Sequence, residues 1–92
     1  MTNIKGQHLI TITAEANETY AVDYGTTYTV NICNHTDDVL VVSDKADYPD
    51  DGTFSGCIKI AADAFYNALT VCGRYLFVTP SADGDITIVK TA

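Results

Sequence analysis

The sequence has no tryptophan, one methionine and two prolines, and it carries few positive charges: five Lys and Arg against twelve Asp and Glu. The formal net charge of −7 disfavours phosphate backbones and anionic membrane surfaces as partners, because both attract clustered cations. The five cations are instead scattered along the chain, at Lys5, Lys45, Lys59, Arg74 and Lys90. We therefore expect neither nucleic acid nor a membrane among the partners.

Long apolar runs are also missing, and none approaches the roughly 20 residues that a membrane-spanning helix needs. The first residues, MTNIKGQHLITITA, contain one lysine and an alternating apolar pattern, which is typical of a strand and not of a signal peptide. The chain is therefore expected to be made in the cytoplasm, or to have lost its secretion information.

No catalytic pattern is present either. Cys33 with His35 or His8 is the only Cys–His arrangement, and the sequence supplies no cation or helix N-terminus beside it to activate the thiol. Paired carboxylates for glycoside hydrolysis would need a cleft, whereas the Asp residues fall in expected turns. There is no phosphate-binding glycine loop and no serine elbow. We expect no enzymatic activity, no catalytic residues and no cofactor.

Three cysteines, Cys33, Cys57 and Cys72, give an odd count without CxxC spacing. This favours reduced thiols over a disulfide framework. Strand alternation places all three opposite the apolar face, so one disulfide with a free thiol stays open. A zinc site built from these cysteines and His35 matches no common ligand spacing, and we expect no metal.

The segment Asp44–Gly56 is acidic and irregular, with Asp44, Asp47, Asp50 and Asp51 ahead of Gly52. Carboxylates around a glycine turn suit calcium, but the alternate spacing and closing Glu of an EF-hand are missing. A solvated acidic loop is favoured, and calcium binding by Asp44–Asp51 is left open.

Alternation of apolar and polar residues is the main structural signal. Tyr28, Val30 and Ile32 share one side of a strand, and the period of two returns at Ile10–Ala14 and Ile86–Ile88. The strands predicted are Gln7–Ala14, Tyr20–Tyr24, Thr27–Cys33, Val39–Ser43, Cys57–Ile60, Tyr75–Thr79 and Asp85–Lys90. Polar residues Asn34–Asp38 predict a turn.

Two of these assignments carry further detail. The last two strands are expected to form a hairpin over the turn PSADG. Ile60–Leu69 is ambiguous between a helix and a strand that continues from Ile58; strand or extended coil is favoured because the period of two runs from Ile58 through Tyr66, as in one long strand.

The pattern predicts an all-β fold: a small antiparallel β-sandwich or jelly-roll-like barrel of about seven to eight short strands. We expect a single domain over residues 1–92. Met1–Gly6 has no clear place in the core and could extend as an arm to a neighbour. The VLVV run at 39–42 predicts a strand covered on both faces or an edge covered by a partner. With the ITIV strand near the C-terminus, it offers apolar edges for oligomerisation.

Six Tyr and three Phe could include a platform for stacking sugars, for instance Tyr20, Tyr24 or Tyr48. The alternative is that the aromatic residues are half-buried strand residues with their hydroxyls at the rim. A carbohydrate- or small-ligand-binding module is therefore the second functional hypothesis.

Three passages resemble small β-sandwich structural proteins of tailed phages and prophages: TYTVNICNHTDDVLVVS, CIKIAADAFYN and RYLFVTPSADGDITIVK. The resemblance covers about two thirds of the chain, from Tyr28 through Val89, and transfers no functional residue. It implies a decoration, head-fibre or tail-associated module that forms symmetric oligomers or binds a larger shell or tail protein. We therefore expect a non-enzymatic virion accessory protein.

Overall fold

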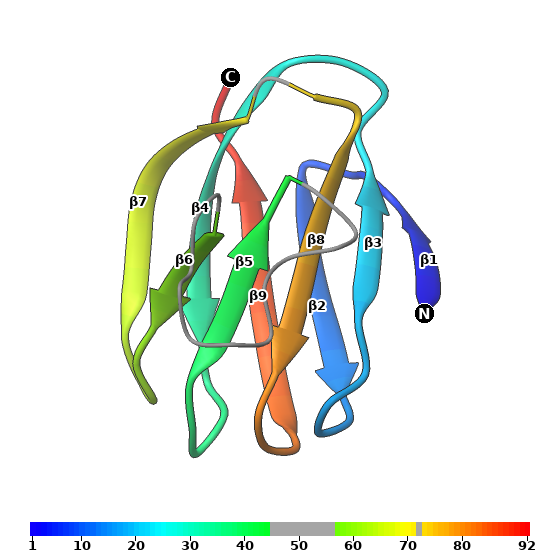
Figure 1. Cartoon of the computed structure of the whole chain (residues 1–92). Helices are drawn as coiled ribbons and strands as arrows, with labels where there is room; N and C mark the ends of the chain where they lie inside the picture. The colour runs from blue at the N-terminus through cyan, green and yellow to red at the C-terminus, as the bar shows by residue number, and fades with distance from the viewer. Residues whose placement is uncertain (45–56, 72) are drawn as a thin grey trace.

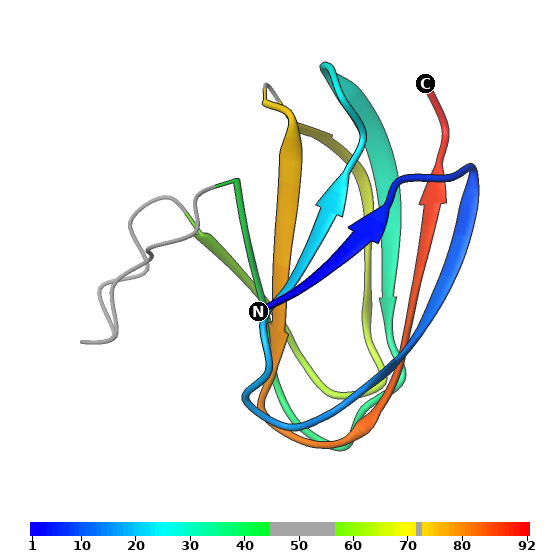
Figure 2. The ribbon, with the colours of Figure 1, turned by 90° about the vertical axis from the view of Figure 1, so that its right-hand side faces the viewer.

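A computed structural model describes residues 1–44, 57–71 and 73–92 of the chain, the side chain of Cys57 excepted. These residues form an all-β sandwich of two sheets and contain no helix, so the predicted fold class is confirmed (Figures 1 and 2). The strands are β1 Thr2–Lys5, β2 Leu9–Ala14, β3 Tyr20–Asp23, β4 Tyr28–Asn34, β5 Leu40–Ser43, β6 Cys57–Ile60, β7 Phe65–Val71, β8 Tyr75–Pro80 and β9 Gly84–Lys90. The described part of the chain thus has nine strands, one more than expected, because β1 was not predicted.

The five-stranded sheet has the order β1-β3-β8-β5-β6, and the four-stranded sheet has the order β2-β9-β4-β7. Figure 2 shows the two sheets as layers seen from the side. The alternating residues of β2, β4 and β9 put an apolar set on one face, which packs against the inner face of the other sheet. The largest fully buried apolar side chains are Tyr28, Ile32, Leu40, Leu76, Ile86 and Ile88. Burial of each Ile or Leu side chain among them contributes roughly 1.5–3 kcal/mol to folding.

Consecutive strands mostly lie in different sheets. Among the described strands, β5 and β6 are the only neighbours in sequence that pair with each other. The predicted hairpin of β8 and β9 is wrong, because β8 pairs with β3 and β5 whereas β9 pairs with β2 and β4. The linker Ser81–Asp83 crosses from one sheet to the other. Turn-forming residues allow this crossing, and they equally allow the hairpin turn within one sheet that was predicted.

Gly84 begins β9 directly after this crossing, with φ near +150°, and a Cβ built there would lie 2.8 Å from the Cα of Thr36. We expect Gly84→Ala to lower the free energy of unfolding by about 2 kcal/mol, from backbone strain and this contact. Gly25→Ala is the matched control, because Gly25 also has positive φ but nothing lies near its would-be Cβ. It should cost about 1 kcal/mol. Urea unfolding followed by tyrosine fluorescence measures both, and equal losses would contradict the role of the Thr36 contact.

The ambiguous segment at 60–69 is not one long strand. Strand β6 ends at Ile60, a tight turn follows in which Asp63 has φ 55°, and the Ala64 N–H donates to the Ala61 carbonyl at 3.1 Å. The chain then enters the other sheet as β7, so strand geometry is confirmed over Phe65–Val71. The alternation of apolar and polar residues runs on through this turn, but there it does not correspond to a strand.

The expectation that VLVV and ITIV offer open edges is wrong. Strand β5 lies between β8 and β6, and β9 lies between β2 and β4, so both strands are hydrogen-bonded on both sides. Leu40 and Val42 of β5 are buried in the core. The sheet edges are β1 and β6 in one sheet and β2 and β7 in the other.

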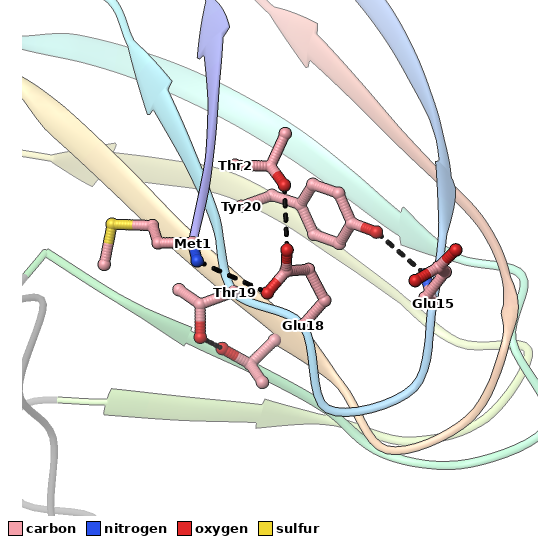
Figure 3. Close-up of polar contacts among 7 residues, drawn as sticks. Met1, Thr2, Glu15, Glu18, Thr19 and Tyr20 are labelled. Atoms are coloured by element: carbon pink, nitrogen blue, oxygen red, sulfur yellow. Dashed lines mark hydrogen bonds and ion pairs between the residues drawn. The ribbon is translucent and has the colours of Figure 1, made fainter.

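The N-terminal segment, expected as an arm, contains β1, which lies parallel to β3 of its own chain. The Thr2 hydroxyl donates to Glu18 Oε2 at 2.9 Å, and the N-terminal amino group lies 3.4 Å from Glu18 Oε1 (Figure 3). The Thr2 hydrogen bond and the nearby amino group hold the pKa of Glu18 below its usual value. These contacts fix β1 at the margin of the five-stranded sheet.

Candidate interaction surface on the four-stranded sheet

The face of the four-stranded sheet that points away from the core, here called the outer face, is nearly free of charge. Strand pairing sets Val89 between Leu9 and Asn31, and sets Cys33 between Thr87 and Phe65. Leu9 is 59% exposed and Phe65 65% exposed, which is unusual for large apolar residues. Asp85 is the one charged side chain that the described registers place on this face. In a chain of net charge −7, such a surface can approach another protein without like-charge repulsion.

The outer face contains a β-bulge with a hollow beside it. Between the Val30–Leu69 and Ile32–Tyr66 pairs, Asn31 faces two residues of β7, Asn67 and Ala68. Ala68 has φ 58°, and its N–H donates to Asn31 Oδ1 at 2.8 Å. Beside the bulge lies a hollow of about 270 Å³, whose lining includes Asn31, Cys33, His35, Phe65, Asn67 and Thr87.

The hollow is lined by no carboxylate and no Lys or Arg side chain: it presents an aromatic ring, two amides, a hydroxyl, an imidazole and a half-buried free thiol on Cys33. Cys33 and His35, paired in the sequence as a nucleophile or zinc candidate, do line one hollow. Within the described residues no group of three or more His, Cys, Asp and Glu side chains could hold a metal. Cys72 and the side chain of Cys57 lie outside the described residues.

The other sequence candidates are dispersed. Asp44 is exposed at the end of β5, and the remaining acidic residues of its loop lie outside the described part of the chain. Tyr20 is 6% exposed, and its hydroxyl accepts a hydrogen bond from the Glu15 N–H at 2.8 Å, so its ring offers no platform (Figure 3). Tyr48 also lies outside the described residues.

The exposed Phe65 and Tyr66 point to opposite faces of β7, because Phe65 pairs with Cys33 and Tyr66 with core-facing Ile32.

Sequence reasoning identified Cys33 and His35 but missed Phe65 and Asn67 as their neighbours. Phe65 comes next to Cys33 only through the pairing of β7 with β4. This pairing joins residues more than 30 positions apart, so no local sequence pattern indicates it. The bulge at Asn67–Ala68 has no sequence signature, since neither residue is the glycine that commonly takes positive φ.

A second unusual feature lies between the sheets. The rings of Tyr24 and Tyr28 have centroids 4.2 Å apart, and within the described structure neither buried hydroxyl has a hydrogen-bond partner. Burial raises the pKa of Tyr24 to about 12, and burial together with the charges of Tyr24 and Asp44 raises that of Tyr28. Both phenols are therefore held neutral by the fold.

This pair predicts instability in alkali. Because the folded-state pKa values lie above the unfolded value of 10.0, the stabilisation is complete below pH 10 and is lost as the pH rises towards about 12. In a pH jump, phenolate absorbance should show a fast phase from accessible tyrosines and a slow phase at the rate of unfolding. The Tyr24→Phe, Tyr28→Phe double variant should lose slow amplitude; an unchanged slow phase would contradict the assignment.

No match to this chain is found among protein-family models, curated proteins or solved structures. The described residues contain no helix long and apolar enough to cross a membrane.

Proposed function

We propose that this chain is a non-enzymatic assembly module, an accessory subunit of a phage or prophage virion of the decoration, head-fibre or tail-associated kind. Its partners are further copies of itself and a larger shell or tail protein. The supporting observation is the outer face of the four-stranded sheet, which exposes Leu9 and Phe65 in an almost uncharged setting. Leu9 lies on β2 and Phe65 on β7, at the two edges of this face, and large exposed apolar residues on one face are typical of protein–protein contact sites. The phage context rests on the sequence resemblance alone.

Light scattering coupled to size exclusion tests self-assembly. The monomer mass is 9.9 kDa, and we expect association above that mass at high protein concentration, with or without calcium. A protein that stays monomeric throughout would contradict self-assembly. Binding to an intact phage shell or tail is the separate test of the virion role.

A small-ligand-binding module is the second candidate, favoured by the hollow beside Phe65. An exposed ring flanked by the amides of Asn31 and Asn67 is suited to a neutral polyol such as a sugar, which stacks on the ring and bonds to the amides. A glycan array tests it. Saturable binding that Phe65→Ala abolishes would support this candidate, and binding that survives the substitution would place the ligand elsewhere.

A further inference from the structure

The four sheet edges differ in how they are protected against pairing with another chain. Edge strands are normally blunted by charges, short length, proline or bulges. Strands β1 and β6 have four residues each and carry Lys5 and Lys59, and β7 carries the bulge at Asn67–Ala68. Strand β2 has six residues without charge, proline or glycine, and it pairs with β9 without a register break. Among the described strands, β2 is the edge without such a device.

The backbone groups on the open side of β2 can be assigned from the ladder. The Lys90 N–H donates to the His8 carbonyl at 2.7 Å, and β2 continues antiparallel to β9 in the same register. Hydrogen-bonded pairs alternate along such a ladder, so Ile10 and Ile12 bond to β9. Leu9, Thr11 and Thr13 therefore point their N–H and C=O groups outward, away from β9, and within the described residues no loop or turn hydrogen bond of the backbone uses them.

We propose that β2 pairs with β2 of a second copy of this chain, antiparallel about a two-fold axis at Thr11, in a contact here called the β2 seam. It rests on the self-assembly proposed above and specifies where that assembly forms. The seam joins two four-stranded sheets into one continuous sheet.

The register follows from the outward groups. Pairing centred on Thr11 is the register in which Leu9, Thr11 and Thr13 of β2 pair among themselves: Thr11 faces Thr11 of the partner and Leu9 faces Thr13 of the partner, which satisfies every outward N–H and C=O of these residues through about six hydrogen bonds. It also keeps outer faces together, because paired residues share a face. Ile10 then adjoins Ile12 across the axis, so the two cores meet.

Charge favours a second copy as the occupant. A chain of net charge −7 repels itself over most of its surface, but residues 6–14 contain no Asp, Glu, Lys or Arg. In the same register Gln7 faces Glu15 of the partner, where an amide can donate to the carboxylate. A contact through one strand is small, so we expect a dimer that dissociates on dilution.

Sedimentation of the full chain over a concentration series tests the β2 seam with three variants. Thr11→Pro removes an outward N–H that no intrachain ladder bond uses, and Thr11→Lys places two cations on the axis. Each should weaken dimerisation at least about thirtyfold. Thr70→Lys is the matched control: Thr70 is exposed on the outer face at the opposite edge of the same sheet, on β7, and its variant should dimerise like the wild type.

The two lysine variants make the same change in net charge, from −7 to −6, which by itself would favour association of an acidic chain. Loss of the dimer in Thr11→Lys alone is therefore a local effect at the seam. Circular dichroism confirms that each variant is folded. If Thr70→Lys dissociates equally, the contact lies on the face and the β2 seam is overturned.

Amide hydrogen exchange provides a readout inside the wild-type protein. With rising concentration the amides of Leu9, Thr11 and Thr13 should become protected, whereas those of Ile10 and Ile12, already bonded to β9, should not change. Association without this alternation overturns the β2 seam but leaves self-assembly intact. A wild type that is monomeric at every concentration overturns both.

Discussion

Replacing Asn34 with alanine is expected to lower the free energy of unfolding by about 4 kcal/mol, because its buried amide joins both sheets at one end of the sandwich. Asn34 is fully buried at the end of β4. Its Nδ2 lies 3.0 Å from the Ile60 carbonyl, 3.1 Å from the Ala61 carbonyl and 2.8 Å from the Asp38 carbonyl. Its Oδ1 accepts from the Thr36 N–H at 3.0 Å and the Thr36 hydroxyl at 2.7 Å.

Truncation removes all these bonds at once; the Asp38 carbonyl keeps the hydrogen bond from the Thr36 hydroxyl at 2.9 Å, whereas each buried group left unsatisfied costs about 1–3 kcal/mol. Asn34→Asp keeps the shape but turns a carboxylate oxygen towards three carbonyls, so the folded-state pKa of the new Asp should be raised. Its stability should then be higher below the unfolded pKa of about 4 and fall as the pH rises. Asn3→Ala, on an exposed position of β1, is the control and should change stability by less than about 0.5 kcal/mol.

Urea unfolding followed by tyrosine fluorescence measures all three variants, since the chain has no tryptophan. A loss below about 1 kcal/mol for Asn34→Ala would mean that water replaces the amide at little cost, in contradiction to the role assigned to it.

The local sequence was sufficient for most strands but not for their partners. Alternation at Ile10–Ala14 and Tyr28–Ile32 requires one buried and one open face, and this local requirement placed β2 and β4 correctly. Whether a short polar linker reverses within a sheet or crosses to the other one depends on the register of distant strands. The residues Ser81–Asp83 are compatible with either path, and the hairpin prediction was wrong for that reason.

Asn34 illustrates a different limit. Asn in a polar cluster predicts a turn because its side chain bonds to nearby backbone, and in the structure it does so through Thr36 and Asp38. The same amide also reaches Ile60, the last residue of β6 in the other sheet, and Ala61 directly after it, 26 and 27 positions away. No local preference encodes that contact, so the turn predicted for Asn34–Asp38 did not include this buried link between the two sheets.

The outer face of the four-stranded sheet was predicted only in part, because its local features follow from the sequence but its strand neighbours do not. Cys33 was correctly placed on the face away from the core by alternation, and it is half-buried there. Its position beside Phe65 depends on the β4–β7 pairing and on the bulge, both of which arise from contacts across the sheet. Edge or interior position is likewise a property of the whole topology, so the edges of the described sheets are β1, β6, β2 and β7, and VLVV lies in the interior strand β5.

Removing the hydroxyl of Tyr28 should leave the protein as stable as before or stabilise it by up to about 1 kcal/mol, whereas removing the ring should be severe. Tyr28 is 2% exposed, and within the described residues its buried hydroxyl has no hydrogen-bond partner. Tyr28→Phe therefore deletes a desolvated polar group and keeps the packing against Tyr24. Tyr28→Ala empties that space and should cost about 4 kcal/mol.

Tyr20→Phe is the matched comparison, since Tyr20 is also buried in the core but its hydroxyl accepts the Glu15 N–H at 2.8 Å. Its loss should cost about 1 kcal/mol, the usual net value of such a bond. The same chemical change is thus expected to have opposite signs at two buried tyrosines of one core, as measured by urea unfolding. If Tyr28→Phe proves as costly as Tyr20→Phe, a water or another group must satisfy the Tyr28 hydroxyl. The cost of its desolvation, and with it part of the alkaline instability, would then be smaller than burial alone implies.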